Sequence, residues 1–406
     1  MLYLKLAWRN TWRNRKRSLI SMGSVLFAVV LALGMRSMQI GFYDKAIDNV
    51  VSYYTGYLQV HAPEYTEQRS LDHSFSASDS LRRALQELEG VTVVAPRLEV
   101  AALISGGDVT DGGLVVGIDP SLETQLTGLR EKVVAGRYLT ADEPGLLLAE
   151  GLADHLGLEL GEDAVILGQG YHGMTAVGKY TIVGLVRFPT PELNTRLAYL
   201  GLTEAQRMSG AEDRLTSLAI MLTSPDALEE AQTSVARLCG ERLEVESWRE
   251  MMPELVQFIQ TDNASGIIML IIVYVVIGFG IVGTVLMMTL ERVREFGMLV
   301  AIGMHRGMLR TVVVLEGLML TFLGTIGGVA VALPIILYFH AHPIYMTGQV
   351  AEMTRRFGFE PVMPFALDPG IFVSQALTVF VIALLASMYP LIKITTLQPA
   401  AAIREG

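Results

Sequence analysis

Four long apolar segments divide this chain of 406 residues. Residues 19–35, 266–290 and 371–392 carry no charged side chain, and residues 311–339 carry one. Because a helix rises about 1.5 Å per residue, about 20 apolar residues cross a hydrocarbon core of about 30 Å. The first stretch is slightly short, but its flanks can complete it. The pattern therefore predicts four transmembrane helices.

The charged residues are distributed unevenly between the connecting segments, and this predicts the orientation. Residues 1–17 contain six Lys and Arg and no acidic residue, and residues 291–310 contain four Arg and two Glu. Residues 41–262 contain 34 acidic and 16 basic residues. Because basic residues accumulate in cytoplasmic segments, both chain ends and residues 291–310 are predicted to be cytoplasmic, and residues 41–262 to lie outside.

The composition agrees with a membrane protein, since only 18% of residues are charged, against about 25% in soluble domains. We therefore predict a multi-pass membrane protein. Its expected parts are a cytoplasmic basic N-terminus (1–17), helix 1 (18–40), an extracytoplasmic domain (41–262), helix 2 (263–290), a cytoplasmic loop (291–310), helix 3 (311–339), an extracytoplasmic loop (340–370), helix 4 (371–392) and a cytoplasmic tail (393–406).

The extracytoplasmic domain contains two stretches with the same order of elements. In each, a strand is followed by an amphipathic helix, a glycine and a second strand. The first comprises a strand at 57–61, a helix at 79–89 and a strand at 91–94. The second comprises a strand at 217–222, a helix capped by Ser224 with Leu228, Ala231, Val235 and Leu238 on its apolar face, and a strand at 243–245.

Residues 124–200, between these stretches, are rich in glycine and in strand-like runs, with a short helix near 150–156. They predict a small β-rich inserted subdomain within a mixed α/β domain of two strand-helix-strand halves. Gly168–Gly173 matches the dinucleotide pattern GxGxxG, which requires a helix to follow. Since residues 175–186 alternate like a strand, a glycine-rich hairpin turn is the favoured interpretation.

The sequence contains no site for catalysis. It has no GxxxxGK[ST] loop for ATP phosphates, and no Cys and His residues at the spacing of metal ligands. No pair of carboxylates can be singled out as general acid and base. We therefore expect a non-catalytic chain that binds no metal or cofactor directly.

The cytoplasmic loop 291–310 combines charged residues in its first turn with an apolar run at 298–302. One interpretation is a solvated connecting helix. A partner protein that buries the apolar run is favoured, because exposed contiguous apolar surface marks interaction sites.

Glu316 lies inside the third apolar segment, and an intramembrane carboxylate is a functional candidate. The alternative is a structural ion pair with Arg310 near the cytoplasmic interface. At the other side of the membrane, an apolar surface continues past Arg36 and contains Met35, Met38, Ile40 and Phe42. Flexible methionines suit a site for varied acyl chains, but these residues could equally pack against the second helix.

Several segments resemble the FtsX-like permease domain and the MacB-type extracytoplasmic core. Those with the FtsX-like pattern are ERVREFGMLVAIG (291–303), VLEG (314–317), GTIGG (324–328) and SMYPLIKITTLQPAAAIRE (387–405). Those with the core pattern are GYLQVH (56–61), EGLADHLGL (150–158) and YTIVGLV (180–186). The chain thus resembles an ABC transporter permease of the FtsX-like/MacB type, and in particular the LolC/LolE-like permeases of lipoprotein-releasing systems.

This resemblance implies a place in the bacterial inner membrane and a coupling helix that contacts a dimer of a separate ATPase, which would bind ATP and magnesium. The implied coupling residues are Glu291, Arg292, Arg294, Glu295, Phe296, Gly297, Leu299, Ala301, Ile302 and Gly303. It further implies a second copy or a sister permease, and mechanotransmission that extracts a lipoprotein or amphiphile from the outer leaflet. Alternatives are an FtsX-like signal transmitter that activates a cell-wall hydrolase, and a MacB-like efflux permease for peptides or drugs. The substrate, the identity of the paired permease and the need for a membrane-fusion protein or an outer-membrane duct stay open.

Overall fold

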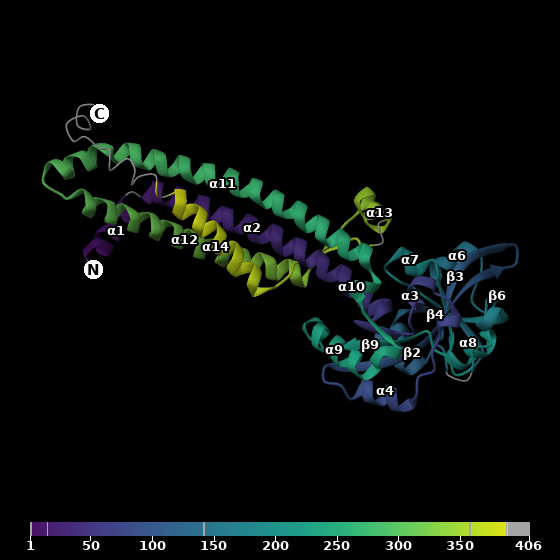
Figure 1. Cartoon of the computed structure of the whole chain (residues 1–406). Helices are drawn as coiled ribbons and strands as arrows, with labels where there is room; N and C mark the ends of the chain where they lie inside the picture. The colour runs from purple at the N-terminus through teal and green to yellow at the C-terminus, as the bar shows by residue number, and fades with distance from the viewer. Residues whose placement is uncertain (1, 14, 141–142, 357–358, 387, 389–406) are drawn as a thin grey trace. The chain divides into compact units, whose positions relative to one another are not determined.

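The computed structural model in Figure 1 describes all residues except 1, 14, 141–142, 357–358, 387 and 389–406. The predicted cytoplasmic tail, the end of the fourth span and nearly all of the 387–405 motif therefore lie outside the described residues. The chain forms two compact units. One comprises residues 1–44, 259–345 and 362–406, and the other comprises residues 45–258 and 346–361.

The first unit is built from long helices. They are α1 (Leu2–Arg13), α2 (Arg15–Val50), α11 (Pro253–Ala301), α12 (Arg306–Ala341) and α14 (Pro369–Ala386). Among the described residues, α2, α11, α12 and α14 are long and apolar enough to cross a membrane. Both α2, with 36 residues, and α11, with 49, are longer than the predicted spans, because hydropathy marks the apolar stretch and not the helix end.

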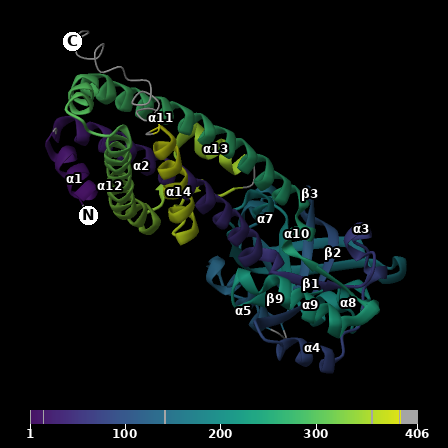
Figure 2. The same cartoon turned by 60° about the vertical axis from the view of Figure 1, so that its left-hand side comes forward.

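Two glycines of α12 allow α2 to pack closely against it. A Cβ at Gly324 would lie 2.8 Å from Val25 Cβ, and a Cβ at Gly328 would lie 2.6 Å from Val29 Cβ. Small residues four apart commonly allow such close helix contacts in membranes. Helix α14 lies alongside α12 (Figure 2), and all four spans contribute to one apolar cluster.

The second unit contains a sheet that joins both predicted strand-helix-strand stretches. The first is β1 (Leu58–His61), α4 (Asp79–Gln86) and β2 (Val91–Gly106); the second is β9 (Ser217–Leu222), α9 (Leu228–Cys239) and β10 (Glu244–Ser247). The strands are antiparallel in the order β10-β1-β9-β2, so the two stretches interleave. Ser224 does not cap the second helix with its side chain, because a 3-10 turn precedes α9. Leu238 is also exposed, whereas the neighbouring Cys239 is buried.

The predicted insert is part of a closed barrel. Its strands are β3 (Val109–Ile118), β5 (Gly145–Ala149), β6 (Asp163–Gln169), β7 (Thr175–Val186) and β8 (Leu197–Gly201), together with β2. Pairing runs β2-β3-β8-β5-β7-β6 and returns to β2. The barrel therefore begins before residue 124, because the 16-residue β2 pairs with β9 at its start and with β6 near its end. The antiparallel β6–β7 hairpin confirms the hairpin interpretation of the glycine-rich segment.

Short elements complete the described chain. In the second unit they are η1 (Val51–Thr55, a π-helix), α3 (Tyr65–Gln68), α5 (Pro120–Thr127), β4 (Val133–Gly136), α6 (Glu150–Leu156), α7 (Pro191–Asn194), α8 (Leu202–Ser209), α10 (Trp248–Met251) and α13 (Gly348–Arg356). The same unit also has the 3-10 helices η2 (Leu71–His73), η3 (Leu129–Lys132), η4 (Tyr171–Gly173), η5 (Pro225–Ala227) and η6 (Gly240–Arg242). In the first unit they are β11 (Ile344–Tyr345) and β12 (Val362–Met363), which pair with each other. The strands of the barrel contribute aliphatic side chains such as Leu146, Leu147 and Ile166 to the main buried cluster of this unit.

Candidate functional site

The predicted coupling segment forms the end of α11, a tight turn and the start of α12. The backbone N–H of Ile302 donates to the carbonyl of Met298 at 3.0 Å, and that of Gly303 donates to Val300 at 3.1 Å. Gly303 has a φ of +106°, which residues with a Cβ rarely adopt. Glycine at this position therefore allows α11 to end and the chain to reverse.

This turn separates the predicted coupling residues into a buried and an exposed set. Arg292, Phe296 and Gly297 are buried, Glu295 is partly buried, and Arg294, Leu299, Ala301, Ile302 and Gly303 are exposed. The side chain of Glu291 lies outside the described structure. Phe296 packs against Leu309 of α12. Arg292 and Phe296, which were expected to face a partner, are buried in this chain by contacts with α12.

Glu316 forms a buried ion pair with Arg292. The Nη1 atom of Arg292 donates to Oε1 and Oε2 of Glu316 at 2.6 and 2.7 Å. Both side chains are less than a tenth exposed. This pair joins α11 to α12 where an unpaired charge would be costly.

The partner of Glu316 differs from Arg310, the alternative suggested by sequence. Six residues along a helix rotate a side chain by about 240°, so Arg310 and Glu316 point in different directions on α12. Arg292 comes from the neighbouring helix, and spacing along one helix could not identify it. The only available signal was that an apolar segment with one carboxylate needs a cation from another segment.

A second ion pair connects α1 to the same end of α11. Arg13 Nη2 lies 2.5 Å from Glu295 Oε2, and the two side chains are 58% and 47% exposed. An exposed pair contributes about 0–1 kcal/mol to stability. Glu295 therefore has a partner within the chain, which the sequence interpretation did not include.

The four candidate substrate-facing residues lie on the outer half of α2. Met35, Met38, Ile40 and Phe42 are all partly buried. Met38 and Ile40 pack against the apolar cluster of the helices. At Met38 and Ile40 the structure therefore favours the alternative, in which the side chains contact the chain's own helices.

The outer half of α2 also contacts the segment that precedes α14. Ser37 and Ala366 exchange two hydrogen bonds, from Ser37 Oγ to the Ala366 carbonyl at 2.6 Å and from Ala366 N–H to the Ser37 carbonyl at 2.9 Å. A Cβ at Gly41 would lie 2.4 Å from the carbonyl oxygen of Pro364. Only glycine therefore allows the segment around Pro364 to contact α2 so closely.

Polar side chains connect α2 to α11 at the same level, and the sequence did not predict this. The α2–α11 polar cluster consists of Arg36, Gln39, Tyr43, Asp262 and Asn263. Tyr43 Oη donates to Asp262 Oδ2 at 2.5 Å, and Arg36 Nη1 donates to Asn263 Oδ1 at 2.7 Å. Gln39 Nε2 donates to Asp262 Oδ2 at 3.2 Å. Helix α11 is thus connected by specific polar contacts to α12 near one end of its apolar stretch and to α2 near the other.

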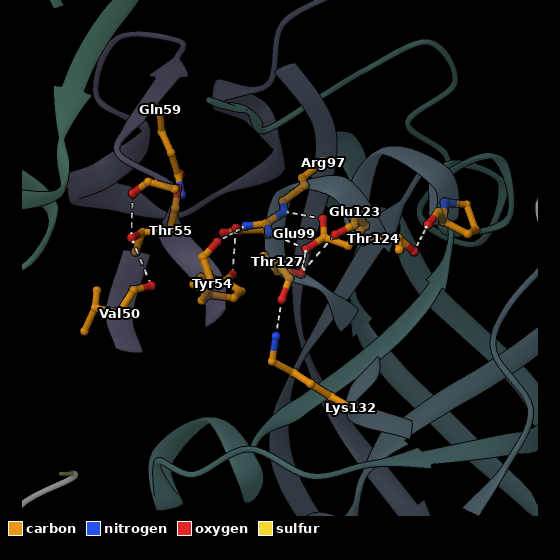
Figure 3. A network of polar contacts seen from close by, with 12 residues as sticks. Val50, Tyr54, Thr55, Gln59, Arg97, Glu99, Glu123, Thr124, Thr127 and Lys132 are labelled. Atoms are coloured by element: carbon orange, nitrogen blue, oxygen red, sulfur yellow. Dashed lines mark hydrogen bonds and ion pairs between the residues drawn. The ribbon is translucent and has the colours of Figure 1, made fainter. Parts of the chain in front are cut away.

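The second unit contains its own buried polar network, shown in Figure 3. Arg97 donates to both carboxylate oxygens of Glu123, at 3.0 and 2.6 Å, and also to the backbone carbonyl of Tyr54. Burial alone would lower the pKa of Arg97, but Glu123 raises it above its ordinary value. The Tyr54 hydroxyl donates to Glu99 at 2.7 Å. This network joins the π-helical turn η1 to β2 and α5.

The buried ion pairs Arg292–Glu316 and Arg97–Glu123 therefore each connect two elements of the fold. Within the part of the chain that the structure describes, no group of three or more His, Cys, Asp and Glu side chains could hold a metal ion. Polar contacts between α2, α11 and α12 are suited to transmitting a movement of one helix to its neighbours.

Comparison with known proteins assigns the two parts of the sequence. Residues 18–238 match the MacB-like periplasmic core domain, and residues 267–399 match the FtsX-like permease C-terminal domain. The periplasmic region of MacB from Actinobacillus actinomycetemcomitans is a similar solved structure, with 14% identity over 53% of this chain and 96% of that one, at a TM-score of 0.36.

Similar full-length relatives carry the name of lipoprotein-releasing system transmembrane proteins. LolC of Neisseria meningitidis serogroup B is 22% identical over 99% of this chain and 97% of its own length. LolE of Haemophilus influenzae is 20% identical over 97% of each chain. Since one family match spans more than half of the chain and the other covers much of the remainder, the chain belongs to the FtsX-like/MacB-type family of ABC transporter permeases.

Proposed function

We propose that this chain is the non-catalytic transmembrane subunit of an ABC transporter that works by mechanotransmission, with its ATPase on a separate chain. The observation that carries the proposal is the apolar turn between α11 and α12. Met298, Leu299 and Ile302 are 44%, 39% and 84% exposed, at a place where the polypeptide is otherwise fixed by the buried Arg292–Glu316 pair. A rigid, apolar and protruding turn is suited to insertion into a groove of a partner protein.

The proposed orientation follows from charge. The turn and α1 lie on the side with the basic segments, which is the cytoplasmic side, where ATP is available to the ATPase. Residues 41–262 then lie on the periplasmic side. Only 11% of the most apolar 18-residue stretch of α11 is buried, against 39% of the corresponding stretch of α12. This exposed face of α11 leaves room for a second copy or a sister permease, in addition to lipid.

The proposed substrate is a lipoprotein or similar amphiphile taken from the outer leaflet. The described spans contain few charges that could line a path for a soluble solute, and Glu316 is already neutralised by Arg292. The relatives that cover nearly the full chain are named for lipoprotein release. Met35 and Phe42, which are partly buried at the outer half of α2, are the candidate contacts for acyl chains.

Photo-crosslinking in native membranes tests the coupling. Benzoylphenylalanine at Ile302 is expected to crosslink to an ABC ATPase identified by mass spectrometry. The matched control is Val109, which is 41% exposed in the other unit and should give no such product. Crosslinks from Ile302 to lipid alone would overturn the coupling role.

Reconstitution of this chain with the ATPase identified by crosslinking tests which class of substrate is moved. Proteoliposomes that contain a fluorescent triacylated lipoprotein should release it into solution on ATP addition, and a soluble peptide or dye in the lumen or the medium should not cross. ATP-dependent transport of the soluble compound would favour efflux. ATP hydrolysis without either movement, combined with activation of a cell-wall hydrolase, would favour signal transmission.

A further inference from the structure

Helix α1 carries a row of aromatic and aliphatic side chains on one face. Leu4, Trp8 and Trp12 are spaced by four residues, so they follow one another along the helix surface. They are 50%, 48% and 41% exposed, and the two indole rings lie edge to face with centroids 5.7 Å apart. Large aromatic side chains of this kind are rarely left in water together, which points to a covering phase or partner.

The adjacent face of α1 is already occupied by the protein. Ala7 and Thr11 are buried at 0% and 1%, and α1 packs against α12. The helix is therefore fixed in place by one face, and the aromatic row beside that face remains open. Because α1 is fixed against α12, the aromatic row has a defined direction relative to the other helices of this unit.

A row of cations lies next to the aromatic row on the other side. Lys5, Arg9 and Arg13 each follow a member of the aromatic row by one residue, which places them about 100° further around the helix. Lys5 and Arg9 are exposed, and Arg13 pairs with Glu295 of α11. Going around the helix, the order is thus a buried face, an aromatic face and a basic face.

We propose that α1 lies in the membrane interface beside α2 and binds anionic phospholipids through this pair of rows. The aromatic row would enter the boundary between headgroups and acyl chains, and Lys5 and Arg9 would contact lipid phosphates. Tryptophan prefers this depth of the bilayer, and cations beside an apolar face are typical of helices that lie on anionic membranes. Continuity supports lipid as the occupant, because α2 begins at Arg15 and its apolar stretch begins at Leu19.

Brominated lipids provide the test, because bromine quenches nearby tryptophan. The sequence has three tryptophans, so Trp248→Phe leaves only Trp8 and Trp12. The full chain would be placed in nanodiscs of phosphatidylcholine and phosphatidylglycerol, with bromine on one or the other lipid at equal mole fraction. Brominated phosphatidylglycerol is expected to quench about twofold more strongly than brominated phosphatidylcholine.

Neutralising the basic row should remove this difference. The double variant Lys5→Gln/Arg9→Gln is expected to show equal quenching by both lipids. The matched control, Arg237→Gln/Arg242→Gln, changes two exposed cations of the other unit and should retain the preference. Equal quenching before any substitution would overturn the binding of anionic lipid. Absence of quenching by either lipid would show that lipid does not reach the aromatic row and would overturn the interfacial position.

A second measurement protects the test against a folding defect, since Trp248 is buried. If Trp248→Phe does not fold, the unmodified chain is compared with Trp8→Phe/Trp12→Phe, and the difference isolates the two helix tryptophans. The result does not depend on the ATPase or on lipoprotein release, so its failure is distinguishable from failure of the proposed function.

Discussion

The buried ion pair between Arg292 and Glu316 allows a quantitative prediction. With Nη1 at 2.6 and 2.7 Å from the two carboxylate oxygens, the attraction is about 6 kcal/mol at an effective dielectric constant of about 20. Transfer of each ion out of water costs several kcal/mol. The net contribution of the intact pair is therefore small, whereas loss of one partner leaves an uncompensated buried charge.

We expect Glu316→Leu and Arg292→Met each to lower the free energy of unfolding by about 3–5 kcal/mol. The double variant should be much less destabilised than either single variant, and close to the unmodified chain, because no charge remains unpaired. Arg292→Lys keeps the charge and should lose less than Arg292→Met. These values refer to unfolding of the helical unit, in which the side chains of Arg292 and Glu316 are 9% and 5% exposed.

Unfolding in mixed micelles with an increasing mole fraction of a denaturing detergent would measure these free energies. The exposed pair Arg13–Glu295 is the matched control, and its single variants should cost only about 0.2–1 kcal/mol. The reasoning would be refuted if both single variants at the buried pair stayed within about 0.5 kcal/mol of the unmodified chain. It would also be refuted if the double variant lost the sum of the two single effects, since that would mean no coupling.

Three further predictions follow from other features. Ile302→Glu should abolish stimulation of the ATPase without changing membrane insertion or stability, since the side chain is 84% exposed; unchanged stimulation would make the turn a simple connector. In a cysteine-free background, Asp108→Cys should react with an impermeant maleimide in intact spheroplasts, and His305→Cys only after lysis, and the reverse labelling would invert the proposed orientation. Gly328→Leu should separate α2 from α12 and destabilise the helical unit by about 1–3 kcal/mol, because even a Cβ would lie 2.6 Å from Val29 Cβ; unchanged stability would show that the helices are not in close contact.

The location of the spans could be predicted from sequence because the physics is local. A stretch of about 20 apolar residues predicts a membrane helix, and each of the four predicted stretches overlaps a helix long and apolar enough to cross a membrane. The extent of each helix was not predictable in the same way. Helix α2 continues to Val50, well beyond its apolar stretch, because packing and backbone hydrogen bonding, rather than hydropathy, decide where it ends.

In the outer unit, local patterns predicted strands and helices better than their pairing. The run at 91–94 was recognised as a strand, but β2 extends to Gly106 and joins the four-stranded sheet to the barrel. Such pairing depends on residues more than 50 positions apart, for example Ile104 with Ile166. Alternation along one strand carries no information about which strand lies beside it.

The candidate site shows the same division. The apolar turn at Ile302 and the place of Glu316 within an apolar helix could be inferred from hydropathy alone. The partner of Glu316, the contact of Glu295 with Arg13 and the α2–α11 polar cluster could not, because each joins residues on different helices. Arg292 was assigned to the coupling residues because the segment 291–303 resembles the family's coupling helix, and that resemblance says nothing about its contact with Glu316.

The polar contacts along α11 connect the turn to the outer side of the membrane. α11 is an uninterrupted helix of 49 residues, or about 74 Å by helical rise. Near its cytoplasmic end Arg292 fixes it to α12, and near the outer end of its apolar stretch Asp262 accepts a hydrogen bond from Tyr43 of α2. A displacement of the Ile302 turn by a partner would therefore move α11 as one body, and α2 would follow through the α2–α11 polar cluster. Such coupled movement of stiff helices through specific contacts is what mechanotransmission requires. It does not require a pathway for a solute between the helices.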